Sequence, residues 1–278
     1  MIKLISSMIF CSGLYASESD CPSSVTDINW YTDFCKSAAE DDILFANFKR
    51  SPLYTVVLEH VTYNFGKQYL ELIKKNYPLL LLNAEQFRTN DLIGNPFVFR
   101  FGKYGIFSPT TLRYMKIAGD IGLMDIELKE AKIIEIGAGY GGQCKVLSDF
   151  TGFKEYTIVD LPEVLLLVKR YLDAFDIKNV KLLTPDQIDS CGDYDLVISN
   201  YAFSECYKLM QDVYLDRIIK NSKHGYMIHN GDAYDHESFY HTEDLLQFLT
   251  EYGYFPNVHP EIPQTGGDIE HPNVVLTW

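Results

Sequence analysis

A glycine-rich stretch in the middle of the chain has the residue types and spacing of a nucleotide-binding turn. In KIIEIGAGYGGQC, residues 132–144, an apolar run around Glu135 is followed by four glycines within six residues. Glycines let backbone N–H groups approach a ligand closely at the start of a helix. Gly137, Gly139 and Gly142 match the pattern G-x-G-x-x-G, which alone is a weak signal. The stretch predicts a strand, a tight turn and a helix that bind such a ligand; a turn that only packs is the alternative.

Two carboxylates around this turn bear on the kind of ligand. Glu135 stands two residues before Gly137, where we expect it at the end of a strand and directed into the ligand crevice. A carboxylate there suits a cationic amino-acid ligand and repels a pyrophosphate. Asp160 ends the next predicted strand, where a carboxylate can accept both ribose hydroxyls. The pair favours S-adenosylmethionine (SAM) over a nicotinamide dinucleotide, which stays as the alternative.

Candidate bases follow two later strands of the chain. Glu205 lies in SNYAFSEC, and His229 and Asp232 lie in MIHNGDAYDHESFYH. Ligands of open α/β sheets bind beyond the carboxyl ends of the strands, so these side chains are placed to take a proton from a bound hydroxyl. Glu205 and His229 are equal candidates on sequence. Each has a structural alternative: a capping or paired acid, and a histidine satisfied by backbone.

The same region invites a metal interpretation. His229, Asp232, Asp235, His236, Glu237 and His241 lie close together in sequence and carry the oxygen and imidazole groups that Mg²⁺ sites use. Their spacing matches no known metal motif. We therefore predict no metal site and interpret the run as a solvated loop that leads into a helix.

The elements that position these residues fall into two halves. Residues 29–130 are mostly helical in their apolar spacing, including VLEHVTYNFGKQYLELIKKNY from residue 57 to 77, and Ser108 before Pro109 predicts a helix from Thr110 to about Ile121. The second half alternates strand-like and helical runs. Its strand-like runs are KIIEIG, YTIVDL, VKLLT, YDLVISN and GYMIHN, then the pair GYFPNVHPEI and HPNVVLTW. This alternation predicts an α/β fold with parallel strands, crossover helices and an antiparallel final hairpin.

Composition limits the partners of the protein. The 278 residues carry a formal net charge of -14. This charge, without a basic stripe, disfavours nucleic acids and anionic membranes. A small neutral or cationic ligand fits better, and we leave a homo-oligomer open.

The N-terminus and the cysteines concern export. MIKLISSMIFCSGLYASESD resembles a secretory signal, and an apolar N-terminal helix is the alternative for residues 1–16. The run is too short for a membrane span, which needs about 20 apolar residues. The six cysteines show no metal-ligand spacing, and Cys21 and Cys35 could form a disulfide if the chain is exported.

The sequence resembles the class I SAM-dependent methyltransferases and, within them, sugar O-methyltransferases. The resemblance rests on IIEIGAGYGGQCKVL, VDLPEVLLLVKRYL, YDLVISNYAFSE and the upstream SPTTLRY, and covers about residues 45 to 278. It implies a Rossmann-like methyltransferase sheet, mostly parallel with an antiparallel last strand, over residues 129–278. Residues 17–128 then form a helical N-terminal region and cofactor lid.

The resemblance also implies roles for individual residues. The methionine and ribose part of SAM is lined by the positions Glu135, Gly137, Ala138, Gly139 and Gly141. Asp160 holds the ribose hydroxyls, Leu161 touches the adenine and Gln187 faces it. Asn200 lies near the transferable methyl group, and Ser108, Thr110 and Arg113 belong to the lid over the cofactor.

Together these features predict an enzyme that moves a methyl group from SAM to a hydroxyl, with a sugar or glycan as acceptor. Such a transfer needs alignment of oxygen, carbon and sulfur and a base for the hydroxyl proton. The alternatives are a NAD-binding oxidoreductase and a non-catalytic binding protein with the same fold. SAM use favours the cytoplasm, whereas the signal-like N-terminus leaves export open.

Overall fold

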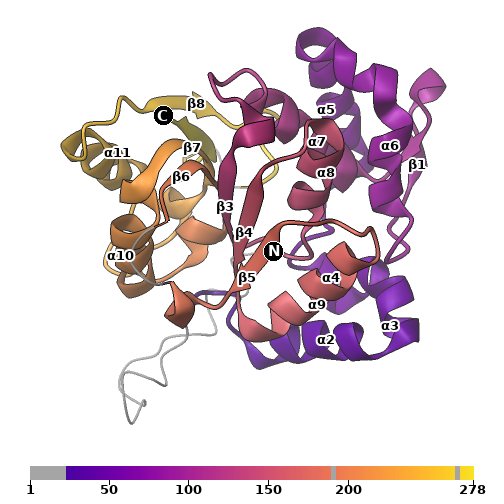
Figure 1. Ribbon diagram of the computed structural model, residues 1–278, viewed down its shortest axis with the longest axis horizontal. Helices are drawn as coiled ribbons and strands as arrows, with labels where there is room; N and C mark the ends of the chain where they lie inside the picture. The colour runs from indigo at the N-terminus through magenta and orange to yellow at the C-terminus, as the bar shows by residue number, and fades with distance from the viewer. Residues whose placement is uncertain (1–22, 189–191, 267–269) are drawn as a thin grey trace.

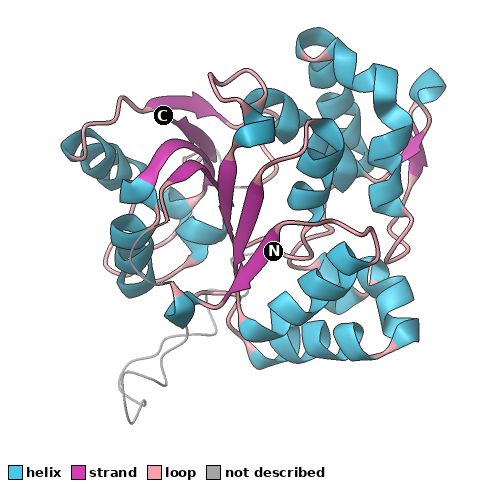
Figure 2. Cartoon of the chain, in the orientation of Figure 1, coloured by secondary structure: helices cyan, strands magenta, loops and turns pink. Residues whose placement is uncertain are grey.

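The computed structural model describes residues 23–188, 192–266 and 270–278. In these residues the chain is a three-layer α/β structure in which a twisted sheet lies between helices on both faces (Figures 1 and 2). The signal-like segment, Cys21 and Cys191 lie outside the described residues.

Seven strands form the central sheet. They are β3 (Lys132–Ile136), β4 (Glu155–Val159), β5 (Val180–Leu183), β6 (Tyr194–Asn200), β7 (Ser222–His229), β8 (Asn257–Pro260) and β9 (Val274–Thr277). Their order across the sheet is β5-β4-β3-β6-β7-β9-β8. The first five in this order pair in parallel, whereas β9 pairs antiparallel with both β7 and β8. The prediction of an α/β sheet with an antiparallel final hairpin is confirmed, and this strand order is that of a class I methyltransferase sheet.

Helices cover the two faces of this sheet unequally. One face carries α7 (Pro109–Ile121), α8 (Gly142–Phe150) and α9 (Pro162–Asp173), and the other carries α10 (Lys208–Arg217) and α11 (Thr242–Glu251) (Figure 1). Each face has its own hydrophobic cluster, with Ile133 and Ile158 on the first side and Ile134 and Val197 on the second. This division follows from alternation, because successive side chains of a strand point to opposite faces.

The residues before the sheet form a helical region packed on the first face. It consists of α2 (Asn29–Glu40), α3 (Asp42–Asn47), α4 (Pro52–Thr55), α5 (Tyr63–Asn76), α6 (Ala84–Arg88) and a short antiparallel hairpin of β1 (Phe99–Arg100) and β2 (Ile106–Phe107). Side chains from Tyr31 onward belong to the same buried cluster as the sheet. The N-terminal region therefore shares its core with the sheet.

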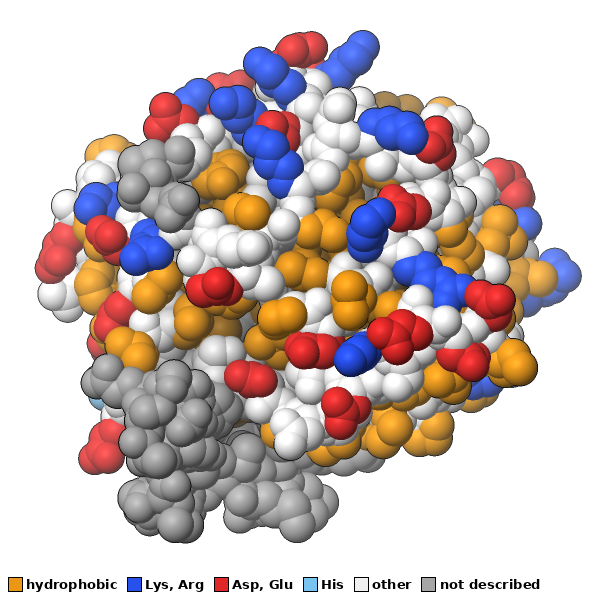
Figure 3. All heavy atoms as spheres, turned by 60° about the horizontal axis from the view of Figure 1, so that its bottom comes forward, with side chains coloured by type: hydrophobic (Ala, Val, Ile, Leu, Met, Phe, Trp, Pro, Cys, Tyr) orange, Lys and Arg blue, Asp and Glu red, His pale blue; other side chains and the backbone are white. Residues whose placement is uncertain are grey.

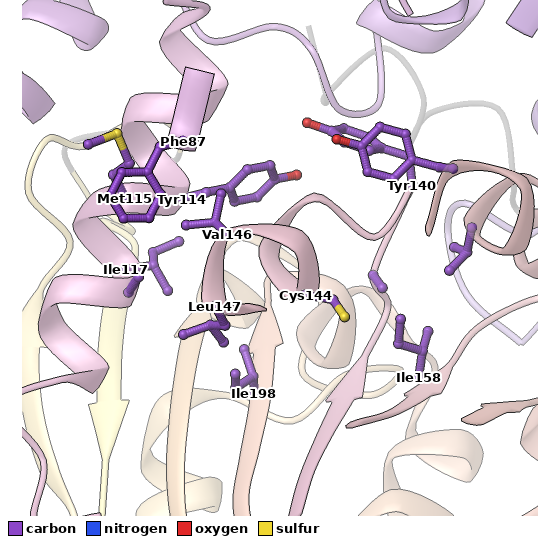
Figure 4. Packing of buried hydrophobic residues seen from close by; sticks show 14 of the residues in the cluster. Phe87, Tyr114, Met115, Ile117, Tyr140, Cys144, Val146, Leu147, Ile158 and Ile198 are labelled. Carbon is purple, nitrogen blue, oxygen red and sulfur yellow. The ribbon is translucent and has the colours of Figure 1, made fainter. Parts of the chain in front are cut away.

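The packing of α7 and α8 shows how this shared core is built. Cys144 and Leu147 of α8 point down toward Ile158 and Ile198 of the sheet (Figure 4), and all four side chains are buried. Burial of apolar area of this kind contributes about 25 cal/mol per Å². The start of α7 matches its prediction: Ser108 is the N-cap, its hydroxyl oxygen accepts the Thr111 N–H at 3.1 Å, and Pro109 is the first helical residue.

One predicted helix is too long. The apolar spacing predicted helix from residue 57 to 77, but α5 begins at Tyr63, after its N-cap Thr62. Residues 56–61 instead form a turn without regular structure between α4 and α5. Tertiary contacts override helical spacing here, since Leu58 in this turn packs against the glycine-rich stretch.

Candidate functional site

The glycine-rich turn lies where β3 ends and α8 begins. Gly137, Gly139 and Gly141 all have positive φ, at 72°, 61° and 86°. Such backbone favours glycine because a Cβ would be strained there. Two of these positions also lack room: a Cβ on Gly137 would lie 2.0 Å from Cβ of Ala202, and one on Gly139 would lie 2.5 Å from a methyl carbon of Leu58. The turn therefore needs glycine for both its conformation and its close contacts.

Asp160 holds this turn from the end of the neighbouring strand β4. One carboxylate oxygen accepts the N–H groups of Ala138 at 2.9 Å and Gly139 at 3.2 Å, and the other accepts the N–H of Leu161 at 2.8 Å. Burial raises the pKa of Asp160 to about 6, against the lowering effect of these three N–H groups. A carboxylate has about four acceptor positions, so Asp160 keeps capacity for the hydroxyls of a ligand.

Glu135 lies beneath the turn, in a position different from the expected one. It is 1% exposed, and one oxygen accepts the hydroxyl of Tyr156 at 2.8 Å. Burial raises its pKa to about 8. The expectation that this carboxylate is directed openly into the crevice is corrected: Glu135 faces the interior between β3 and α8, because its strand position puts it on the same face as Ile133.

The end of β6 contributes two residues with unusual features. Asn200 closes the strand, and its side-chain oxygen is buried with no hydrogen-bond partner. Tyr201 follows with φ of 73°, rare for a residue with a side chain, and its N–H donates to the Ile228 carbonyl at 2.9 Å. Strained backbone of this kind concentrates at functional sites. Next in sequence, Ala202 makes the contact with Gly137, so the end of β6 and the glycine turn adjoin.

Glu205 lies one short turn further on. Its carboxylate accepts the Asn230 side-chain amide at 3.3 Å, and burial raises its pKa despite that hydrogen bond. Burial raises the pKa of Tyr31, on α2. The negative charges of Asp160 and Glu205 raise it further, so both carboxylates act on the same phenol. Glu205 and Asp160 therefore lie near each other at one edge of the sheet, with α2 over them.

His229 ends β7 and Asp232 lies in the short turn that follows it. His229 is 1% exposed, neither ring nitrogen has a hydrogen-bond partner, and burial lowers its pKa to about 4. Its ring packs toward Gly231 and the Tyr240 carbonyl, on the face that α11 covers. Asp232 accepts the backbone N–H and hydroxyl of Thr242 at 2.7 and 2.6 Å. Asp232 is therefore corrected from a candidate base to a cap of α11, and His229 to a buried neutral side chain.

Other predicted ligand residues have local partners. Gln187 is exposed, and its side-chain oxygen accepts the Thr184 N–H at 3.0 Å in a short 3₁₀ turn. Leu161 is the N-cap residue of α9 and is partly buried. The first remains exposed beyond β5 and the second lies directly beside Asp160.

The predicted lid residues lie on a helix of the shared core, and their place over the cofactor stays a prediction. Ser108, Thr110 and Arg113 are 1%, 1% and 3% exposed, because α7 is a core helix packed against α5 and α8. The Ser108 N–H donates to Asp91 at 2.7 Å, and the Thr110 hydroxyl donates to Glu59 at 2.9 Å. The part of the chain that does cover the glycine turn is the segment 56–61, through Leu58.

Charged clusters away from the turn offer little for a metal. In the residues that the structure describes, no group of three His, Cys, Asp or Glu side chains is arranged to hold an ion. Two histidines of residues 229–241 have other partners: His236 contacts Asp244 at 2.8 Å, and a His241 ring nitrogen lies 3.1 Å from the Tyr234 carbonyl. On the face shown in Figure 3, acidic and basic side chains are interspersed with hydrophobic ones.

Sequence reasoning missed Glu59, Tyr201 and Asn230. Glu59 stands in a stretch with helical spacing, and nothing local marks it as buried beside the turn. Asn230 offered a signal, because it follows a strand at the same edge as Asn200. The strain at Tyr201 has no counterpart in its residue type.

No helix of the described chain is both long and apolar enough to cross a membrane. No family model and no curated protein sequence matches the chain.

Solved structures do resemble it in fold. The methyltransferase domain of bacterial CtHen1 is 15% identical, with 59% of this chain and 96% of that chain covered and a TM-score of 0.46. The precorrin-6y C5,15-methyltransferase of Geobacter metallireducens GS-15 is 18% identical over 54% of this chain and 80% of that one, with a TM-score of 0.41. An rRNA methylase of Streptococcus thermophilus is 14% identical over 54% and 86%, with a TM-score of 0.38. The fold assignment rests on the strand order of this chain itself.

Proposed function

We propose that this protein is a SAM-dependent O-methyltransferase that transfers a methyl group to a hydroxyl of a sugar or glycan. The observation that carries the proposal is the joint placement of the glycine turn, Asp160 and the end of β6 at one edge of a methyltransferase-type sheet. Ligands of open α/β sheets bind at this edge.

The described residues fit SAM as the cofactor. Asp160 would hold the ribose hydroxyls, the Gly137–Gly141 backbone would lie against the methionine and ribose part, and the unpartnered Asn200 oxygen would accept a hydrogen bond from the ligand. When bound, SAM supplies an electrophilic methyl group on a sulfonium. Burial raises the pKa values of Asp160 and Glu205, and no cationic side chain lowers either of them. Such carboxylates suit a cationic ligand, because its charge would stabilise their ionised form.

Glu205 is the base that the geometry favours. It lies at the strand edge near Asp160, and its raised pKa brings it closer to neutrality, where general bases work best. Its carboxylate takes the proton of the acceptor hydroxyl while Asn230 orients it through the 3.3 Å hydrogen bond. His229 is a weaker base, since burial lowers its pKa to about 4.

A sugar acceptor is consistent with the side chains near Glu205. The ring of Phe239 lies between those of Tyr207 and Tyr234 in tilted contacts, with centroids 5.0 and 4.6 Å apart. Together with Asn230 and Glu205 they combine apolar ring faces with hydrogen-bonding groups, which is what a hydroxylated ring needs.

A NAD-dependent oxidoreductase is the second candidate, favoured by the G-x-G-x-x-G spacing. The antiparallel β9 between β7 and β8 speaks against it, because dinucleotide-binding sheets use a parallel second half.

The test is incubation of the full chain with radiolabelled SAM and a panel of monosaccharides, sugar nucleotides, glycans and small hydroxyl compounds that are not sugars. We expect label in at least one sugar with the wild type and none with Glu205→Gln. Label in a non-sugar hydroxyl compound alone would overturn the sugar acceptor, and reduction of NAD with any of these compounds would overturn the methyltransferase.

A further inference from the structure

Glu59 is a buried acid beside the glycine turn that no sequence motif marks. One of its carboxylate oxygens accepts the Thr110 hydroxyl at 2.9 Å, and the other is buried with no hydrogen-bond partner. The preceding residue, Leu58, occupies the space directly next to Gly139. The free oxygen of Glu59 therefore lies in the immediate neighbourhood of the turn.

Arg113 is a buried base near the junction of β6 and the glycine turn. It follows Thr110 by one helical turn on α7, is 3% exposed, and its Nε has no hydrogen-bond partner. Its guanidinium carbon lies 5.5 Å from the ring centroid of Tyr114 and 5.8 Å from that of Tyr201. Tyr201 precedes Ala202, which contacts Gly137, so Arg113 faces the junction of β6 and the turn.

The two charges do not form an ion pair with each other. No salt bridge joins Glu59 to Arg113 within 4.0 Å in the described parts of the chain. The positive charges that act on Glu59 are those of Lys49 and, more weakly, Arg113, and the carboxylate that acts on Arg113 is Glu261. A buried charge without a partner is costly. Glu59 and Arg113 each keep one hydrogen-bonding atom without a partner. Together they match a ligand that carries both a positive and a negative group.

We propose that Glu59 and Arg113 bind the zwitterionic amino-acid end of the cofactor, Glu59 its ammonium and Arg113 its carboxylate. This inference rests on the proposed function, and it adds a ligand from the N-terminal region to a site otherwise built by the sheet. Leu58 fills the space next to Gly139, so the segment 56–61 borders the position proposed for the amino-acid end of the cofactor.

The test compares two nucleosides that differ only in the amino-acid end. S-adenosylhomocysteine carries that end, and 5′-methylthioadenosine lacks it. Calorimetric titration of the full chain with both ligands, for wild type, Glu59→Gln and Arg113→Lys, isolates the contribution of each charge. Urea unfolding of each variant checks that it folds.

We expect Glu59→Gln to weaken S-adenosylhomocysteine about tenfold or more and to leave methylthioadenosine unchanged, since a hydrogen bond to a charged group is lost only with the former. A decarboxylated analogue of S-adenosylhomocysteine should lose the dependence on Arg113 but keep that on Glu59. Thr110→Val is the matched control, because it removes the hydrogen bond that anchors Glu59 but keeps both charges.

Equal weakening of both nucleosides by Glu59→Gln, or no weakening of either, would overturn the assignment while leaving the proposed function intact. Failure of the wild type to bind either nucleoside would overturn the proposed function, and the assignment with it.

Discussion

Asp160 shows how one side chain can serve both the empty and the occupied site. Its carboxylate ties down the N–H groups of Ala138 and Gly139, and so holds the turn in a shape ready for a ligand. Preorganisation of this kind lowers the cost of ordering the site when the ligand binds. Glycine spacing and a strand-end acid are visible in the sequence; the hydrogen bonds between them are not.

The raised pKa of Asp160 gives a pH dependence for cofactor binding. Ribose hydroxyls donate to the ionised carboxylate, which is present above a pKa of about 6 and disappears below it. We therefore expect affinity for S-adenosylhomocysteine to be about tenfold lower at pH 5 than at pH 7.5 in the wild type, and independent of pH over this range in Asp160→Asn. Calorimetry at both pH values measures this. A flat wild-type profile would contradict the role of Asp160.

Glu205 and His229 are separated by substitution and rate. Glu205→Gln removes the base, so kcat should fall by about 100-fold or more with little change in cofactor affinity. His229→Gln changes a buried side chain whose pKa is lowered to about 4, so its effect should be seen in stability and not in kcat. Single-turnover methyl transfer and urea unfolding provide the two measurements. A larger loss of kcat in His229→Gln than in Glu205→Gln would reverse the assignment.

The contact between the N-terminal region and the glycine turn is made by a buried polar cluster around Asn90. Asn90 is fully buried; its amide donates to the Thr111 hydroxyl at 2.7 Å and the Tyr140 hydroxyl at 3.2 Å, and its side-chain oxygen accepts the Tyr171 hydroxyl at 2.6 Å. Lys49 donates to the Asn90 carbonyl at 2.6 Å and lies 4.1 Å from the centroid of Tyr140, within the glycine turn. The helical region thereby fixes the turn from outside the sheet.

Loss of the Asn90 side chain should weaken both stability and binding. Asn90→Ala removes the amide donor from the Tyr140 hydroxyl and leaves the Tyr171 hydroxyl only its 3.2 Å contact with the carbonyl of residue 90, whereas the Thr111 hydroxyl keeps Asp91 as its acceptor. An unsatisfied buried group costs about 1–3 kcal/mol, so we expect the free energy of unfolding to fall by about that amount. The turn also loses an anchor, and cofactor affinity should fall. Urea denaturation checks the first effect and calorimetry the second. Asn76→Ala, at an exposed helix end, is the control; equal effects of the two substitutions would contradict the role of the cluster.

The sheet could be predicted from the sequence, whereas the cover over the site could not. Short apolar runs predict strands such as β3 and β6, and Ser108 with Pro109 predicts the start of α7. These features can be predicted because each depends only on a few neighbouring residues. The apolar residues of the segment 56–61 have helical spacing, but the segment does not form a helix, and its Leu58 packs against Gly139. The sequence also could not show which face of the sheet the side chains of His229 and Glu135 point to, because strand register decides it.

At the scale of the whole molecule, the net charge of -14 bears on which ligand is attracted. SAM carries one positive charge more than S-adenosylhomocysteine, so the field of an acidic protein favours SAM and salt screens this preference. We expect the affinity ratio of SAM to S-adenosylhomocysteine to fall by a factor of about three between low and high ionic strength. Competition titrations at the two salt concentrations measure it. A ratio that rises with salt would contradict an acidic binding site.

The most direct measurement of the central claim is titration of the full chain with SAM, S-adenosylhomocysteine and NADH, for wild type and Asp160→Ala. We expect micromolar binding of the two sulfur compounds by the wild type, strong weakening of both in the variant, and no binding of NADH. Binding of NADH, or of none of the three, would contradict the assignment of the glycine turn to SAM.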